Sequence, residues 1–248
     1  MALCALFSAC SRQPPAPPAP PPPPALTQWP QGVTVPLKIT EQLILEIPLQ
    51  YERTAIESRP APARAFISQP SDRAEAQFDF FLPNFSGYTL QNYRNDSDPD
   101  KVEVVYLHAG NRHEADPGAP GEYPPNMLKR ALAESLNAGN YQDQYGLRCY
   151  QGRVPSARLT CYGARGGGED IMLTTRQPPY APGDFPQLQA RYFSTRYAGV
   201  RIAWRTAVRN LPRWREIDAR IWRFIEAWQV APVTATPNAP GPGSQPAR

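Results

Sequence analysis

The residues from 199 to 230 constrain the fold more than any other part of this chain. In GVRIAWRTAVR, apolar residues alternate with arginines or small residues from Val200 to Val208, a period of two that predicts a β-strand with one buried and one wet face. The next segment, LPRWREIDARIWRFIEAWQV, has apolar residues at helical spacing, and we expect Asn210 to cap this helix with Pro212 in its first turn. A sheet with one apolar face needs a cover, so the helix should pack on the sheet. The apolar stripe consists of Trp214, Ile217, Ile221, Ile225 and Trp228.

Shorter patterns predict further elements upstream. Alternation in VTVPLKI, LILEIPL, AQFDFFLP and DIMLTTR indicates strands, and Phe78 and Phe80 should share a face. KVEVVYL should put Val102, Val104 and Tyr106 on one face and Val105 and Leu107 on the other. PPNMLKRALAESLNAGN predicts a second amphipathic helix, with prolines at its start and Gly139 just past its end. Its apolar residues Leu128, Leu132 and Leu136 recur every four positions.

These elements predict an α+β fold, mostly antiparallel sheet covered by two amphipathic helices. Strands precede a helix in each half of the chain, an order that would fit an internal duplication, although no repeated residues align. Residues 31–230 are enough for one domain with a sizeable core.

Proline marks the two ends of the chain. The sequence has 32 prolines among 248 residues, and residues 10–30 include a run that favours an extended polyproline spacer. Residues 231–248 repeat proline and glycine without period and carry almost no large apolar side chain, so they predict a disordered tail.

The first ten residues, MALCALFSAC, resemble a lipobox, in which a cysteine after small residues receives a lipid. Residues 1–9 would then be a signal segment of lipoprotein type, and Cys10 the lipidation site. The segment lacks Lys and Arg and is short, as a truncated signal would be. The resemblance predicts a periplasmic protein anchored to the inner or outer membrane. An accidental ALCALFSAC motif in a cytoplasmic protein is the alternative.

Cys149 and Cys161 lie in GLRCYQGRVPSARLTCYG, where similar residues flank each cysteine and a proline turn separates them. This pattern predicts a hairpin with the two cysteines facing each other, and in an oxidising compartment they would form a disulfide. Two reduced buried cysteines are the alternative.

The sequence offers no residue set for catalysis, and we expect no catalytic residue, no metal site and no cofactor. His108, His113, Glu114 and Asp116 have no known metal-ligand spacing and predict a polar loop. GARGGGED lacks the Gly-Lys-Ser/Thr ending of a phosphate loop, and its Glu169 and Asp170 are expected to be solvated. The protein is therefore predicted to bind a partner rather than to be an enzyme.

Arginines crowd the last strands and helix, and few acidic residues lie near them in sequence. Such a basic face suits an acidic protein or lipid headgroups, whereas export disfavours nucleic acid. Ordinary arginines whose stems cover apolar surface are the alternative. The arginines are Arg191, Arg196, Arg201, Arg205, Arg209, Arg213, Arg215, Arg220 and Arg223.

Three segments of the chain resemble lipoproteins encoded beside type VI secretion lipase effectors. They are FLPNFSGYTLQNYR, the cysteine hairpin and YAGVRIAWRTAVRNLPRWREIDARIWRFIEAWQV. The resemblance covers most of residues 78–230. It implies a membrane-tethered periplasmic immunity protein that binds and neutralises a secreted phospholipase, and hence a protein partner. A structural or assembly lipoprotein of the envelope is the competing reading. Residue type alone suggests, as exposed partner-binding residues, Tyr88, Tyr93, Arg94, Arg112 and Arg165.

Overall fold

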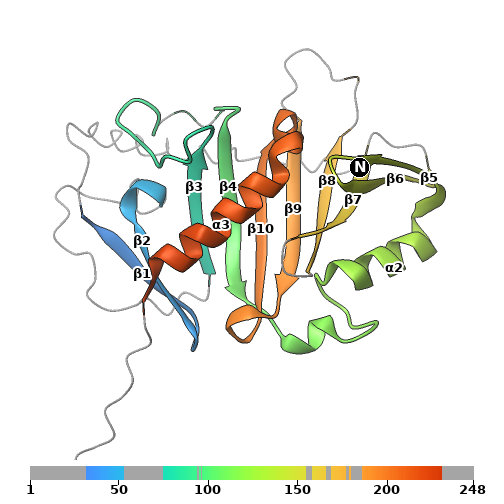
Figure 1. Cartoon of the computed structure of the whole chain (residues 1–248), viewed down its shortest axis with the longest axis horizontal. Helices are drawn as coiled ribbons and strands as arrows, with labels where there is room; N and C mark the ends of the chain where they lie inside the picture. The colour runs from blue at the N-terminus through green and yellow to red at the C-terminus, as the bar shows by residue number, and fades with distance from the viewer. Residues whose placement is uncertain are drawn as a thin grey trace, which may run out of the picture.

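The computed structural model describes residues 32–52, 75–93, 95, 97–154, 158–165, 169–176, 179 and 186–230. Cys10 and the segments predicted to be a signal segment, a spacer and a disordered tail lie outside them. The described residues form two antiparallel sheets, a three-stranded one in the order β1-β2-β11 and an eight-stranded one in the order β3-β4-β10-β9-β8-β7-β6-β5 (Figure 1). Two helices accompany the large sheet, which confirms the predicted α+β class. No described helix is long and apolar enough to cross a membrane.

The strands have the following bounds: β1 Thr34–Thr40, β2 Leu43–Pro48, β3 Glu75–Phe81, β4 Lys101–Ala109, β5 Leu136–Gln144, β6 Leu147–Gly152, β7 Arg158–Ala164, β8 Asp170–Arg176, β9 Gln187–Ser194, β10 Val200–Ala207 and β11 Gln229–Val230. The helices are α2, Pro124–Glu134, and α3, Trp214–Trp228. Within the described ranges the short 3-10 helices are η1 Leu49–Tyr51, η2 Arg112–Ala115, η4 Arg196–Ala198 and η5 Val208–Arg213.

The strand and helix at the C-terminal end form the centre of the core. Every second residue of β10 is buried, including Trp204, which is fully buried. Helix α3 lies diagonally across the face of the large sheet (Figure 1), and all five residues of its predicted stripe are buried. The stripe and the alternation of β10 are therefore confirmed.

The start of α3 differs from the prediction. The chain leaves β10 through η5, and α3 begins only at Trp214. Asn210 does not cap α3, because its side-chain amide donates to the carbonyl oxygen of Pro99 (3.0 Å) and to the hydroxyl of Thr206 (2.9 Å). Asn210 instead fixes the end of β10 to the turn before β4.

Strand β4 contains a bulge that breaks the predicted alternation. Leu107 pairs with Ile202 and Val104 pairs with Trp204. The two residues of β4 between them therefore lie opposite a single residue of β10, Ala203. As a result Leu107 joins Val102 and Val104 on the buried face, whereas Val105 and Tyr106 are half-buried. The prediction that Tyr106 shares a face with Val102 and Val104, and that Leu107 lies on the other face, is therefore wrong.

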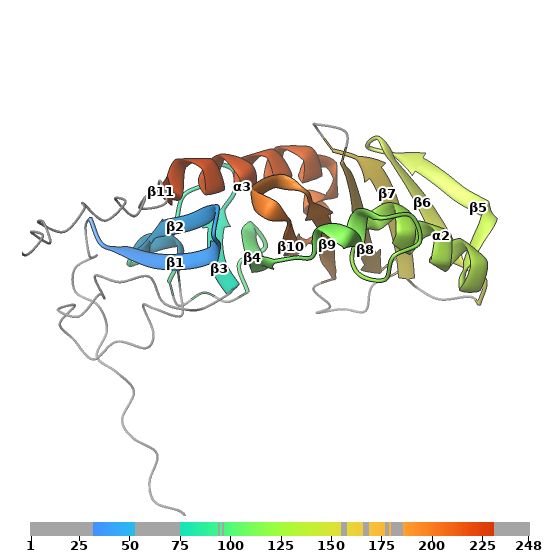
Figure 2. The same ribbon diagram turned by 90° about the horizontal axis from the view of Figure 1, so that it is seen from below.

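Helix α2 ends earlier than predicted. It stops at Glu134, and Leu136 and Gly139 belong to β5 rather than to the helix end. Leu128, Leu132 and Leu136 nevertheless lie in one apolar cluster. This cluster also contains Tyr150, Tyr162 and Met172, whose neighbours along β6, β7 and β8 belong to the core under α3. The two helices therefore cover opposite faces of the large sheet, as the second view shows (Figure 2).

The small sheet closes the other end of the core. The apolar residues of the hairpin β1–β2, among them Leu37, Leu43, Leu45 and Ile47, are buried in the same core as α3. Residues 229–230 add β11 to β2 immediately after α3 ends. In both halves of the chain, strands precede a helix. The two halves nevertheless share one sheet, because β4 of the first half pairs with β10 of the second.

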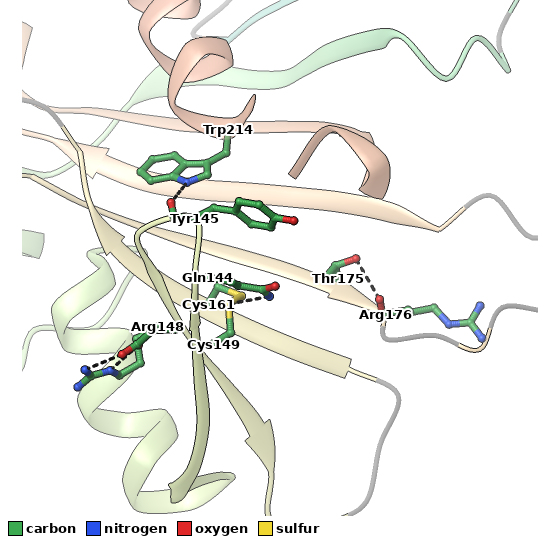
Figure 3. Close-up of a disulfide and its surroundings, with 9 residues drawn as sticks. Gln144, Tyr145, Arg148, Cys149, Cys161, Thr175, Arg176 and Trp214 are labelled. Atoms are coloured by element: carbon green, nitrogen blue, oxygen red, sulfur yellow. Dashed lines mark hydrogen bonds and ion pairs between the residues drawn. A yellow bond between two sulfur atoms is a disulfide. The ribbon is translucent and has the colours of Figure 1, made fainter. Parts of the chain in front are cut away.

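The cysteine hairpin forms as predicted. Cys149 on β6 and Cys161 on β7 are direct cross-strand partners and are joined by a disulfide (Figure 3). Gln144 donates to the sulfur of Cys149 (3.4 Å). The indole N–H of Trp214 donates to the carbonyl oxygen of Tyr145 (3.0 Å), so the first residue of α3 is fixed to the turn between β5 and β6.

Candidate functional site: a groove beside helix α3

The basic face predicted from the sequence is largely neutralised. Six of its nine arginines form ion pairs with carboxylates contributed by other parts of the fold. Arg205 of β10, for example, meets Glu103 of β4 at 2.7 Å. The other pairs are Arg191 with Glu122, Arg196 with Glu226, Arg201 with Glu114, Arg209 with Asp100 and Arg213 with Glu216.

The three other arginines lie on α3 and have no carboxylate partner among the described residues. Arg220 extends over the rings of Phe85 and Phe224 and so covers apolar surface, as the alternative reading expected. Arg215 and Arg223 are exposed. Both line a half-open hollow of about 560 Å³, which we call the α3 groove. It is lined by Arg165, Glu169, Arg196, Trp214, Arg215, Asp218, Ala219, Trp222, Arg223 and Glu226.

Arg165 forms the floor of the α3 groove. Its side chain is buried between Asp218 of α3 (2.8 Å) and Glu169 (2.6 Å) and lies 3.8 Å from the ring centroid of Tyr192. Ser194 donates to the other oxygen of Glu169 (2.7 Å). Burial raises the pKa of Asp218, and the charge of Arg165 opposes this rise. The Arg165–Asp218–Glu169 network thus fixes α3 to the chain between β7 and β8.

Several polar atoms at this floor lack a hydrogen-bond partner within the described part of the chain. They are the hydroxyl of Tyr192, the indole N–H of Trp222 and one carboxylate oxygen of Asp218. The Tyr192 hydroxyl nevertheless interacts with both Asp218 and Trp222, so the three groups form one buried polar cluster beside Arg165.

The rim of the α3 groove is aromatic and basic. Arg196 lies over the ring of Trp222 at 4.2 Å and pairs with Glu226 at 2.8 Å. At the other end Arg215 lies over Trp214 at 4.7 Å. These guanidinium groups lie against aromatic faces, an arrangement that limits their motion.

The residues suggested from residue type do not form one surface. Tyr88 and Arg165 were expected to be exposed, and both are buried. The hydroxyl of Tyr88 hydrogen-bonds to Asp79, and that carboxylate also meets Lys101. Tyr93 is half-buried against the cluster around Tyr88, and Arg112 is exposed on η2. Arg94 lies outside the described residues.

The His-containing segment has a structural role that the sequence did not reveal. His108 lies in β4 rather than in a loop, and the residues that follow form η2, where Asn111 and Glu114 make a capping box and His113 contacts Asp116. Glu114 is buried and accepts both forks of the Arg201 guanidinium at 2.6–3.0 Å. The described residues contain no group of three or more His, Cys, Asp or Glu side chains placed to hold a metal ion. Glu169, which was also predicted to be solvated, instead contacts Arg165 and Ser194.

Glu114 should make the protein acid-sensitive. Burial alone would raise its pKa, but hydrogen bonds from Arg201 and from the backbone N–H groups of Asn111 and Glu122 hold the pKa below its usual range. A lowered folded-state pKa adds stability above the unfolded-state pKa, and this stability is lost as the pH falls through the folded-state value. We expect the free energy of unfolding of Glu114→Gln to fall less than that of wild type between about pH 5 and pH 3. Urea unfolding at each pH tests this, and equal slopes would contradict it.

No family model matches the sequence, and no curated protein sequence matches it. Among solved structures, the fold is similar to that of Smlt3025, described as an immunity protein of the Stenotrophomonas maltophilia type IV secretion system. The TM-score is 0.50, the identity is 12%, and the match covers 80% of this chain and 94% of Smlt3025. The similarity is one of fold. It extends over nearly all of Smlt3025.

Proposed function

We propose that this protein binds and neutralises a protein effector, and that the α3 groove receives an acidic side chain of that effector. The observation that carries the proposal is the pair Arg215 and Arg223, exposed and without a carboxylate partner among the described residues, beside a hollow lined by Trp214 and Trp222. The fold similarity to an immunity protein supports the same class of function.

The composition of the α3 groove suits an interface anchor. Tryptophan, tyrosine and arginine are the residues that most often dominate binding energy at protein interfaces. The groove holds two tryptophans and four arginines, whereas its three acidic residues are engaged with Arg165 and Arg196. An incoming carboxylate would therefore meet uncompensated positive charge in a place already shaped by packed side chains.

The finer proposal concerns location and partner. We propose a periplasmic lipoprotein anchored to the membrane through Cys10, which neutralises a phospholipase delivered by a type VI secretion system. It is supported by the lipobox-like first ten residues, by the resemblance described above and by the disulfide Cys149–Cys161, because disulfides persist in oxidising compartments. An inhibitor tethered to the membrane that its target attacks has a high local concentration there. The reading as an assembly lipoprotein loses much of its support, because it relied on a basic face that is mostly ion-paired.

Deletion of the protein tests the function. The producing strain should lyse when neighbouring effector genes are expressed, and survival of the deletion strain would refute the immunity role.

Complementation of the deletion strain with variants tests the site. Arg215→Glu/Arg223→Glu should bind the effector at least tenfold more weakly than wild type and fail to rescue growth, because two attractive charges become repulsive. Lys129→Glu, which reverses an exposed charge on α2, on the other face of the large sheet, is the control and should rescue fully. Equal binding by both variants would remove the α3 groove from the interface.

A further inference from the structure

We propose that strand β5 pairs edge to edge with β5 of a second copy, so that one sheet runs through two molecules. This inference goes beyond the proposed function and does not depend on it. It rests on the open edge of β5, on the side chains along that edge and on the row of tyrosines that ends there.

Strand β5 is the last strand of the eight-stranded sheet. It pairs with β6 on one side and has no strand on its other side among the described residues. In both views it forms one end of the molecule (Figures 1 and 2). Seven of its nine residues, from Asn137 to Asp143, are exposed. An edge strand presents unpaired backbone N–H and C=O groups, which can pair with another strand.

The features that normally protect an edge are few in β5. The strand LNAGNYQDQ has no proline and no lysine. Its only charged residue, Asp143, is already paired with Arg148 by two hydrogen bonds of 2.9 and 3.2 Å. The one protective feature is a bulge between Leu136 and Tyr141, where four residues of β5 lie opposite Gln151 of β6. From Tyr141 to Gln144 the pairing is regular.

The side chains of β5 can pair with copies of themselves. The Gln142 amide has a donor and an acceptor and no partner among the described residues, whereas the amides of Asn137, Asn140 and Gln144 each already make one hydrogen bond, to Gly139, Gln151 and Cys149. An edge designed for a charged partner would show a net charge, whereas this one is neutral once Asp143 is paired. Charge and hydrogen-bonding capacity therefore favour an identical strand as the occupant.

Tyrosines continue to the open edge. The rings of Tyr162, Tyr150 and Tyr141 follow one another across β7, β6 and β5, with centroid separations of 6.4 and 5.9 Å. Tyr141, at the end of this row, is 47% exposed and is held under the guanidinium of Arg148 at 4.5 Å. A second copy would extend the row with another tyrosine, and aromatic cross-strand pairs stabilise sheets.

Twofold symmetry then selects a register. If Tyr141 lies opposite Tyr141 of the second copy in an antiparallel pair, Gln142 lies opposite Asn140 and Asp143 opposite Gly139. No acidic residue faces another. A contact of one strand per molecule is small, so the dissociation constant should be on the order of micromolar or weaker.

Sedimentation of the full chain tests the proposal, with Cys4→Ser and Cys10→Ser to remove the lipid and stray thiols. The mass should rise from 27.6 kDa toward twice that value as concentration increases. Gln142→Lys should keep the chain monomeric, because it places like charges across the twofold axis, whereas Val154→Lys adds the same charge at an exposed position off the edge and should dimerise. A monomer at every concentration up to the millimolar range would overturn the proposal.

A cross-link tests the register even if Gln142→Lys folds poorly. Under oxidising conditions Tyr141→Cys should form a disulfide between two copies. Tyr145→Cys, at a tyrosine of similar exposure in the adjoining turn, would not face itself and should cross-link at least tenfold more slowly. Equal cross-linking rates for the two variants would overturn the proposal. It would also be overturned if the wild-type chain were always monomeric and Gln142→Lys failed to capture the effector, and the edge of β5 would then be assigned to the effector.

Discussion

Replacing Arg165 with alanine should lower the free energy of unfolding by about 3–5 kcal/mol, because it leaves a buried carboxylate without its counter-charge. Asp218 is buried in α3 and accepts a hydrogen bond from Arg165 at 2.8 Å. The same guanidinium meets Glu169 and covers the ring of Tyr192. Its removal therefore costs an ion pair, a second charge interaction and packing against an aromatic face.

Urea unfolding of the Arg165→Ala protein measures this loss. Arg215→Ala is the matched control, since Arg215 lies on the same groove but is exposed, and it should change the free energy of unfolding by less than about 0.5 kcal/mol. Arg165→Met/Asp218→Leu should recover much of the stability, because it removes both buried charges together. A loss below about 1 kcal/mol for Arg165→Ala would show that the Arg165–Asp218–Glu169 network does not secure α3.

Loss of the disulfide should lower the free energy of unfolding by about 2–3 kcal/mol in the chain-entropy model. Cys149 and Cys161 are 12 residues apart in sequence and are buried under α3, so the bond restricts a short loop and fills part of the core. The change is Cys149→Ala/Cys161→Ala, which avoids burying a hydroxyl. Thermal or urea unfolding in the absence of reductant measures the difference from wild type.

Reductant provides the control for the disulfide. It should lower the stability of wild type toward that of Cys149→Ala/Cys161→Ala and leave the double variant unchanged. If wild type loses nothing in reductant although free-thiol assays show complete reduction, the disulfide contributes nothing to stability.

Local periodicity accounts for what the sequence predicted well. The alternation of β10, the stripe of α3 and the facing cysteines each depend on spacing within about 20 residues, and each was confirmed. Local signals failed where two of them competed. Gly139 is typical of a residue just past a helix end, and it predicted a helix through Leu136. Leu136 instead begins β5, and α2 ends before it, at Glu134. A bulge such as that in β4 leaves no mark in the pattern of apolar residues.

The candidate site was harder to predict because its partners are distant in sequence. Arg165 and Asp218 are 53 residues apart, and Arg205 and Glu103 are 102 apart. A count of nearby acidic residues therefore made the arginines look unopposed, and residue type alone made Arg165 and Tyr88 look exposed. Of the nine arginines, only Arg215 and Arg223 are both exposed and without an ion-pair partner among the described residues, and the proposed function rests on the groove that they line.

The position of β10 has a consequence for the synthesis of this protein. Residues 200–207 lie between β4 and β9 in the middle of the large sheet, although they are among the last of the domain to leave the ribosome. Until they emerge, β3 and β4 have no strand to join them to β9, and α3 is not yet there to cover Phe78 and Phe80. Pairings of such long sequence separation form late and slowly. The core under α3 can therefore close only when the chain is nearly finished, and the apolar residues of β3 and β4 stay uncovered until then.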